Sequence, residues 1–487
     1  MASDRTSSFH PGGARDGSLA PQHLPHHADD LEPSLSTLLL HADEPDLSLN
    51  PVGPVAPDVN LSTTYRHAHP SSELYEMPHD QYDWQKPQAH IYSRYTQDSR
   101  NRVEQVLSSL LGGHAVTYAS GLNAAFAVAL HYQPRVIALR RGYFGCHESF
   151  KTYAKTKGDV QFIDLDAPYP ASTPNSPLLV WLETPLNPSG EARDIAHYAS
   201  LAHQAGGKLA VDATFAPPPL QNPFKQGADC VMHSGTKYFG GHSDLLVGVV
   251  AVKDAEEAKR LWHDRTYLGS PPGNLESYLL LRSLRTLTVR VEKQSQTATK
   301  LAQWLWTLCP RNEEAKVQNE RDFVIRKSGI VGWVAHGSLQ PRGPNMQDTG
   351  SGKKPEGVDF DPRAQMPGGF SPTFSLRISG GQHNGGARAA YLPHQTAFWI
   401  PATSLGGVES LIEQRILAEA SEDPGTIRLS VGLEAFEDLQ ADLRRALLRV
   451  LELDGAQGGG KGGQLRWRLA EVKLEAEQKA AKERGEA

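Results

Sequence analysis

Residues 228–250 read ADCVMHSGTKYFGGHSDLLVGVV. Lys237 lies in the middle of this segment, between hydroxyl-bearing residues and a glycine pair, and an apolar run flanks each side. Burial disfavours the charged form of a lysine, so a buried lysine offers a neutral amine as nucleophile and base. Ser234 and Thr236 have hydroxyls that suit a phosphate. A solvated lysine in a Gly/Ser turn is the commoner explanation of such a window, so other segments must agree before a cofactor is inferred.

Short apolar runs alternate with helix-length segments on the N-terminal side of this lysine. Residues 101–111 place apolar side chains on one helical face, and residues 121–132 form an alanine-rich helical pattern. The short runs are residues 115–118, 136–139, 160–163, 178–182, 209–211 and 230–232. Runs that are apolar on both sides and separated by helices are typical of buried parallel strands. We therefore predict an α/β protein with a doubly wound sheet.

Changes in composition predict the domain organisation. A long helical stretch, 274–299, is expected to lead into a second domain. The predicted segments are a disordered tail (1–34), an extended arm (35–94), the large domain (95–282), a smaller C-terminal domain (283–454) with a surface insert (336–367), and a glycine-rich linker with a charged helix (455–487).

The overall composition excludes several classes of protein. Lys+Arg number 49 and Asp+Glu 55, a net charge of −6, which argues against a general nucleic-acid binder. The three cysteines are far apart and predict neither a metal site nor a disulfide framework. No apolar run approaches the ~20 residues of a membrane span, and the N-terminus lacks a secretory pattern. A cytoplasmic protein with no membrane partner is predicted.

Polar residues directly follow the carboxyl ends of several predicted strands. In α/β sheets, ligands bind at this edge of the sheet. Asp212 can keep a pyridine nitrogen protonated, or it can cap the next helix. Asn187 can bond a ring oxygen, although Asn-Pro is also a common turn. Ser120 begins a helix whose first amides form an anion site, or it is a plain cap. Tyr143 can stack on a planar ring or simply pack against its neighbours.

These separate signals agree on one cofactor, pyridoxal 5′-phosphate (PLP). The chain resembles the Cys/Met-metabolism (trans-sulfuration) PLP enzymes, which include cystathionine γ-synthase, cystathionine β-lyase, cystathionine γ-lyase and methionine γ-lyase. The resemblance spans about residues 38–451 and implies the fold-type I transferase architecture, with a large PLP-binding domain and a smaller α/β C-terminal domain. The matching motifs are IYSRY (91–95), YASGL (118–122), ETPLNP (183–188), VDATF (211–215), SGTKY (234–238), SLGGVES (404–410) and IRLSVG (427–432).

The resemblance implies a role for each matching residue. Lys237 and Tyr143 are the implied catalytic residues: the lysine carries PLP as a Schiff base and moves the Cα proton, and the tyrosine stacks on the ring. Asp212 pairs with the pyridine nitrogen. The cofactor-binding residues are Tyr92, Arg94, Ser120, Gly121, Leu122, Tyr143, Asn187, Asp212, Thr214, Ser234, Thr236 and Lys237, of which Gly121, Leu122, Ser234 and Thr236 hold the phosphate.

Two further expectations follow from the resemblance. Ser404 and Arg428 bind the substrate carboxylate, because a guanidinium donates two parallel hydrogen bonds to a carboxylate. Tyr92 and Arg94 reach the phosphate of the neighbouring subunit, so the protein is expected to be at least a dimer and, by resemblance, a tetramer.

The reaction is predicted to be α,β-elimination by a carbon–sulfur lyase, giving pyruvate, ammonia and a thiol. Cystathionine γ-synthase-like γ-replacement on an activated homoserine ester, and γ-elimination, stay open because they use the same residues. A non-catalytic PLP-binding scaffold is the remote alternative. Two departures from the family pattern, YFGCHE at 143–148 in place of a YGGT-like loop and Ala213 in place of an asparagine, leave the substrate undetermined.

Overall fold

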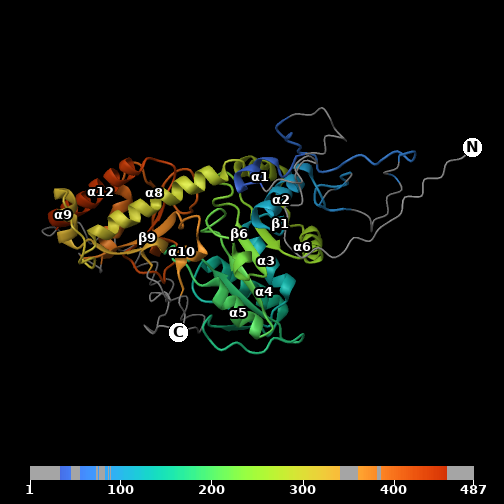
Figure 1. Ribbon diagram of the computed structural model, residues 1–487, viewed down its shortest axis with the longest axis horizontal. Coiled ribbons are helices and arrows are strands. Elements are labelled where there is room, and N and C mark those ends of the chain that lie inside the picture. Colours follow the sequence, from blue (N-terminus) through green and yellow to red (C-terminus); the bar gives the residue numbers. More distant parts are fainter. Residues whose placement is uncertain are drawn as a thin grey trace, which may run out of the picture.

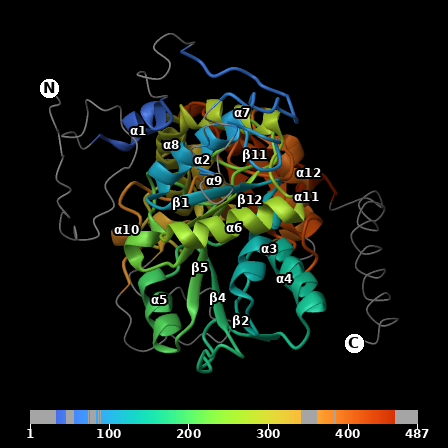
Figure 2. The same ribbon diagram turned by 90° about the vertical axis from the view of Figure 1, so that its right-hand side faces the viewer.

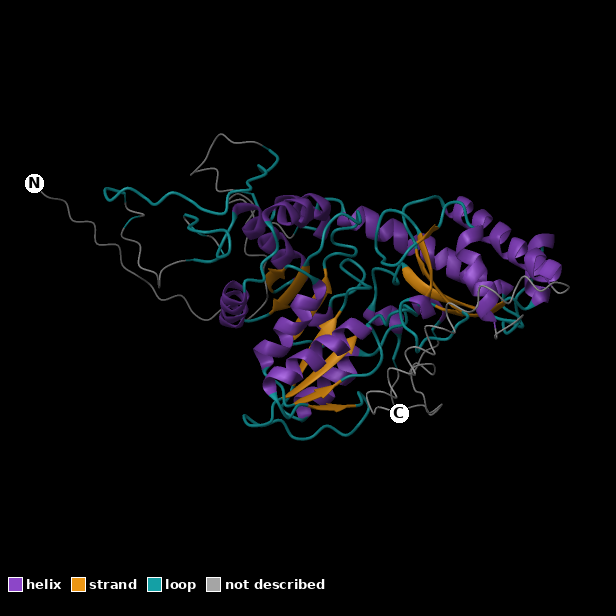
Figure 3. Ribbon diagram, turned by 180° about the vertical axis from the view of Figure 1, so that it is seen from behind, coloured by secondary structure: helices purple, strands orange, loops and turns teal. Residues whose placement is uncertain are grey.

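The computed structural model describes residues 33–44, 55–72, 75, 83–85, 87, 89–340, 360–380 and 385–457. They form two lobes, each built on its own sheet, and the long helix α8 (Leu287–Leu308) runs from one lobe into the other (Figure 1). Figure 3 shows the strands of the two sheets as separate groups. The boundaries of the predicted large and small domains stay a prediction. Residues 1–32 of the predicted tail (1–34) and residues 458–487 of the predicted linker and charged helix (455–487) lie outside the described residues.

The larger sheet has seven strands in the order β1-β7-β6-β5-β4-β2-β3. All strands run in one direction except β7, which is antiparallel to both β1 and β6. The prediction of a mostly parallel sheet is therefore confirmed. The strands are β1 (His114–Tyr118), β2 (Val136–Ala138), β3 (Gln161–Ile163), β4 (Leu178–Glu183), β5 (Lys208–Asp212), β6 (Cys230–Ser234) and β7 (Gly248–Val252).

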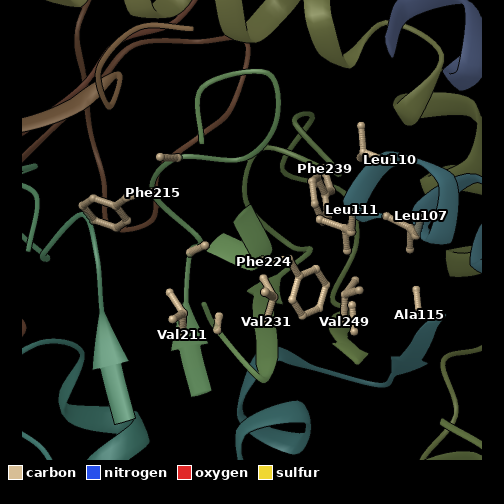
Figure 4. Close-up of a cluster of buried hydrophobic side chains, with 14 of the residues drawn as sticks. Leu107, Leu110, Leu111, Ala115, Val211, Phe215, Phe224, Val231, Phe239 and Val249 are labelled. Carbon is tan, nitrogen blue, oxygen red and sulfur yellow. The ribbon is translucent and has the colours of Figure 1, made fainter. Parts of the chain in front are cut away.

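Helices cover both faces of this sheet (Figure 2), as the doubly wound prediction requires. Alternate residues of β6 show the two faces: Val231 joins one buried cluster, and Cys230 and Met232 join another. Figure 4 shows the first cluster, in which leucines of α2 pack over strand valines and Phe224. The flanking helices are α2 (Asp98–Leu111), α5 (Ile195–Gln204) and α7 (Asn274–Leu284) on one face, and α3 (Gly121–Tyr132), α4 (Phe144–Lys157) and α6 (Ala255–Leu268) on the other.

The smaller lobe is built on a five-stranded sheet with the order β10-β11-β12-β9-β8. Its strands are antiparallel apart from the β10–β11 pair, and α8, α11 and α12 contribute to the apolar core beside it. The elements are β8 (Val331–Ala335), β9 (Thr373–Ile378), β10 (Ile400–Pro401), β11 (Leu411–Gln414), β12 (Thr426–Ser430), α9 (Glu320–Ser328), α11 (Gly386–Tyr391) and α12 (Phe436–Gln457).

Short elements complete the described chain. The helix α1 packs against α2 at the start of the predicted arm, and Asp43 just after it forms ion pairs with Arg102 and Arg285. These short elements are α1 (Leu35–His41), α10 (Pro362–Gln365) and the 3₁₀ helices η2 (Pro223–Gln226), η3 (Gly337–Leu339), η5 (Leu392–Gln395) and η6 (Arg415–Leu417).

Three details differ from the sequence-based predictions. The helical stretch predicted over 274–299 is two helices, because the chain turns after Leu284 and Arg290 donates to the carbonyl of Ser283 at 2.9 Å. The strand predicted at 160–163 is not buried, because β3 lies at the sheet edge with Phe162 exposed.

The third difference concerns the predicted surface insert, 336–367, whose ends are buried. Gln340 exchanges two hydrogen bonds with the backbone of Ala192, at 2.8 and 2.9 Å. Gln365 accepts from Ile195 N at 3.0 Å and donates to Arg193 O at 2.9 Å. These ends therefore join the two lobes, while residues 341–359 lie outside the described part of the chain.

Candidate active site

Lys237 lies just beyond the end of β6, in the loop that leads to β7. Its Nζ donates to Ser404 Oγ of the smaller lobe at 2.8 Å. Burial, followed by the nearby charge of Arg428, lowers the pKa of Lys237 to about 8. The lysine is therefore much easier to deprotonate than a solvated one, as the sequence analysis predicts for a nucleophilic amine.

Asp212 ends β5 beside it and is buried. Its Oδ1 accepts from the amide and the hydroxyl of Thr214, at 3.1 and 2.5 Å. The Thr214 hydroxyl oxygen also accepts from Ser234 N at 2.8 Å, which ties the end of β5 to the end of β6. Burial raises the pKa of Asp212 to about 6, and none of the ion pairs among the described residues involves this carboxylate.

Glu183 is a second buried carboxyl, and the sequence analysis assigned it no role. It ends β4 and lies opposite Asp212 in the β4–β5 register. Its two oxygens accept from Tyr143 N at 2.7 Å and from Asn187 N at 2.8 Å. Burial, and then the charge of Asp212, raises the pKa of Glu183 to about 8. The signal in the sequence was its place as the last residue of a buried strand, directly before the predicted Asn187 turn.

Arg428 connects this group to Lys237. The residue is buried on β12, where its Nη1 donates to Asn187 Oδ1 at 3.2 Å and its Nη2 donates to Ser404 O at 2.9 Å. Burial lowers the pKa of Arg428 to about 10. An unbroken series of contacts therefore runs from Lys237 through Ser404, Arg428 and Asn187 to Glu183, and brings residues from both lobes together.

The start of α3 forms one wall of the site. Ser120 caps the helix by accepting from Asn123 N at 3.1 Å, and Gly121 and Leu122 are its first two residues. A Cβ atom on Gly121 would lie 2.7 Å from Ser234 Oγ, so only glycine allows this helix end to approach Ser234 so closely. The Thr236 hydroxyl is already bonded within the loop, because it accepts from Val247 N at 3.0 Å.

Tyr143 precedes α4, and the residue is 39% exposed. The ring packs beside Phe144, with 5.2 Å between centroids, and a Cβ on Gly145 would collide with it. The YFGCHE segment, which departs from the family pattern, therefore places the Phe144 ring beside Tyr143, the residue predicted to stack on the cofactor.

Tyr92 and Arg94 make their contacts elsewhere among the described residues, away from this group. Tyr92 is exposed, and Arg94 lies over the rings of Tyr92 and Tyr95 at 5.6 and 4.9 Å while donating to Thr266 O at 3.3 Å. Their predicted contact with a neighbouring subunit stays a prediction.

The residues present fit PLP. The buried carboxylate of Asp212 lacks the cation that a protonated pyridine supplies, and Lys237 offers an amine with a lowered pKa. At the start of α3, a helix of 12 residues, the amides of Gly121 and Leu122 have no acceptor within the helix and suit a phosphate, while the Asn123 amide donates to the Ser120 cap. The exposed Tyr143 ring offers a face for a planar ligand.

A family model described as "Cys/Met metabolism PLP-dependent enzyme" matches residues 36–314. The chain belongs to this family. The Cys/Met-metabolism enzymes depend on PLP, and the two-lobed architecture found here is the fold-type I arrangement that the sequence analysis predicted. Among the described residues, no helix combines the length and apolar character needed to cross a bilayer.

Named relatives carry three related activities. Cystathionine gamma-synthase of Escherichia coli is 32% identical, across 80% of this chain and 92% of its own length. Cystathionine beta-lyase of Lactococcus lactis subsp. cremoris is 30% identical, across 74% and 89%. The crystal structure of cystathionine gamma-lyase from yeast superposes with a TM-score of 0.68 at 26% identity, across 86% of this chain and 99% of that one.

Proposed function

We propose that this protein is a PLP-dependent carbon–sulfur lyase that acts on a cystathionine-like thioether amino acid and releases pyruvate, ammonia and a thiol. The observation that carries the proposal is the Lys237–Ser404–Arg428 series of contacts, which joins a deprotonatable amine to a buried guanidinium. An amino acid whose carboxylate binds Arg428 thereby presents its Cα to Lys237.

The cofactor-binding roles follow from where each residue lies. When bound, PLP acts as an electron sink for the carbanion formed at Cα. Asp212 would keep a proton on the pyridine nitrogen, Asn187 would bond the ring oxygen, and Tyr143 would stack on the ring. The phosphate would be held by the amides of Gly121 and Leu122, at the start of α3 that Ser120 caps, and by Ser234 and Thr236. Thr214 would support the cofactor through its hydrogen bonds to Asp212.

Substrate binding and proton transfer involve the residues of both lobes. Arg428 and Ser404 fix the carboxylate of the amino acid, which orients the Cα–H bond. Lys237 removes the Cα proton, because its lowered pKa leaves a substantial neutral fraction near neutral pH. The elimination would break the Cβ–S bond, with the thiolate leaving as a thiol after it takes up a proton, and addition of water would give pyruvate and ammonia.

Cystathionine gamma-synthase-like γ-replacement is the second candidate. It is favoured by the relative of that name in E. coli, which matches 80% of this chain. That reaction needs a second proton transfer at Cβ and exchanges the γ-substituent of an activated homoserine ester for a thiol. Both reactions use the same residues to hold the cofactor.

One experiment separates the two reactions. The PLP-loaded protein is incubated with L-cystathionine, and in a parallel reaction with O-succinyl-L-homoserine and L-cysteine, and products are identified by mass spectrometry. Pyruvate and homocysteine from L-cystathionine are the expected result. Formation of 2-oxobutyrate and cysteine indicates a γ-lyase, and cystathionine produced in the second reaction indicates the synthase.

Glu183→Gln is expected to weaken PLP binding and to lower kcat/KM by about tenfold or more, because the amide nitrogen of glutamine cannot accept the second backbone N–H. Tyr143 and Asn187 would then lose their shared anchor. Titration of the cofactor-free protein with PLP, followed by visible absorbance, measures the first effect. The matched control is Glu148→Gln, on the exposed surface of α4, which should change neither value. Unchanged PLP affinity in Glu183→Gln would show that Glu183 does not position these residues.

The site also predicts an assembly. We propose that Tyr92 and Arg94 bind the phosphate in the neighbouring subunit of a dimer, and that two such dimers form a tetramer. In support, both residues precede the large lobe, and their contacts among the described residues lie away from the site of their own chain. Light scattering of the PLP-loaded protein tests the oligomeric state.

A further inference from the structure

The guanidinium of Arg428 is part of a buried ionic group that the sequence analysis did not predict. Strands β11 and β12 lie side by side (Figure 2), and their antiparallel register places Glu413 opposite Arg428. Arg428 Nη2 lies 2.6 Å from Glu413 Oε2, and Arg415 Nη1 donates to the same oxygen at 2.9 Å. We call these three residues the charge bridge.

The charge bridge is shielded from water. The exposed fractions are 5% for Arg428, 8% for Glu413 and 2% for Arg415. Charges in such surroundings interact much more strongly than on the surface, because little solvent screens them. Glu419 also approaches Arg415 Nη2, at 3.9 Å, but its side chain is 26% exposed, so water weakens its influence.

Within the charge bridge itself, two guanidiniums face one carboxylate, an excess of one positive charge. Outside it, Glu419 and Glu422 lie near Arg415, and burial raises the pKa of Glu422, which reduces its negative charge. The Nε of Arg415 has no hydrogen-bond partner among the described residues, so its hydrogen-bonding capacity is not used up within this lobe. Glu413 alone beside Arg428 would neutralise the guanidinium and repel a second carboxylate. Arg415 counteracts that effect, because it binds the same carboxylate oxygen.

We propose that Glu413 and Arg415 determine substrate specificity by setting the charge at Arg428, so that this end of the site accepts one carboxylate. The proposal rests on the proposed function, in which Arg428 binds the substrate carboxylate. The site then selects molecules with a carboxylate next to the reacting amine, and it discriminates against amines that lack one. Arg415 acts through Glu413 and Arg428 and is a positioning residue.

Binding of L-alanine to the PLP-loaded full-length protein tests the proposal, since L-alanine has the amine and the carboxylate but no leaving group. Binding is followed by the change in visible absorbance of the cofactor. Arg415→Met is expected to weaken L-alanine binding about tenfold or more, and Glu413→Gln to strengthen it about threefold or more. The double variant should return to within about threefold of the native protein, since the two removed charges cancel.

Three controls separate charge from structure. Arg415→Lys keeps the charge and should bind L-alanine within about threefold of the native protein. Arg377→Met removes a guanidinium from a surface ion pair on neighbouring β9 and should leave binding unchanged. Ethylamine, which lacks the carboxylate, should react equally with the native protein and with Arg415→Met.

The outcomes that overturn the proposal are distinct from failure of the proposed function. If Arg415→Met binds L-alanine as the native protein does, or if the double variant binds no better than Arg415→Met, the charge bridge does not set specificity. Arg428→Met should abolish L-alanine binding. If it does not, the assignment of the carboxylate site fails, and the charge-bridge proposal fails with it. If only Arg428→Met weakens binding, the proposed function stands and the charge bridge alone is rejected.

Discussion

Lys237→Ala is expected to lower turnover by roughly 10³- to 10⁴-fold, because one substitution removes both the amine that holds the cofactor and the base at Cα. The visible absorbance of the lysine-bound cofactor should also disappear. Burial lowers the pKa of Lys237 to about 8, so in the native protein the neutral amine that reacts with PLP becomes abundant as the pH rises through that value. The rate of PLP incorporation into cofactor-free native protein should therefore increase over the same range.

The control for this substitution is Lys151→Ala, which removes an exposed lysine of α4 and should change neither turnover nor absorbance. Methylamine added to Lys237→Ala should restore part of the activity, because a small amine can replace the missing base. A Lys237→Ala protein with full turnover would remove the lysine from the mechanism. A native protein that shows no turnover but keeps a PLP-dependent interaction would favour the scaffold alternative.

Much of the order of strands and helices could be predicted because the strands of the larger sheet are short runs, and a helix follows β1, β2, β4 and β7. Reversal of β7 could not be predicted, since Gly248–Val252 is as apolar as its parallel neighbours and nothing local gives its direction. The break between α7 and α8 was missed because it contains neither proline nor glycine. It depends on Arg290, which bonds back to Ser283 from the next helix.

The predicted site residues Lys237, Asp212, Asn187, Ser404 and Arg428 lie together because each ends a strand or borders the junction of the lobes. Glu183 and Glu413 were not assigned roles, and their contacts explain why. Glu183 accepts hydrogen bonds from the backbone amides of Tyr143 and Asn187. Contacts with backbone amides leave no pattern of side chains in the sequence, so they could not be predicted. Glu413 meets Arg428 only through the β11–β12 register, and Arg415, just beyond the end of β11, bonds the same carboxylate.

Asp212→Asn is expected to lower turnover by roughly 10²- to 10⁴-fold while PLP still attaches to Lys237. An asparagine cannot supply the negative charge that stabilises a protonated pyridine nitrogen, so the electron sink is lost although the cofactor remains. Visible absorbance measures PLP occupancy, and product formation from L-cystathionine measures turnover. Retention of both occupancy and full turnover would show that Asp212 does not support the protonated ring.

The same residue predicts how stability depends on pH. Burial raises the pKa of Asp212 from 3.8 to about 6, so the folded cofactor-free protein binds this proton more tightly than the unfolded chain does. Its contribution to the free energy of unfolding is fully present below pH 3.8 and is lost as the pH rises through about 6. Glu183 acts in the same direction, with its loss extending to about pH 8.

In the cofactor-free native protein, the two carboxyls should contribute a fall in melting temperature as the pH rises from 3.8 through about 8. Buried His233 and His336, whose pKa values burial lowers to about 3 and about 4, act in the opposite direction, so the contribution of the carboxyls is measured by comparison with variants. Asp212→Asn should reduce that fall, and Asp212→Asn combined with Glu183→Gln should reduce it further. PLP should also reduce it in the native protein, because a protonated pyridine gives the ionised Asp212 a cationic partner. Equal pH dependence with and without PLP would mean that the cofactor ring does not pair with this carboxylate.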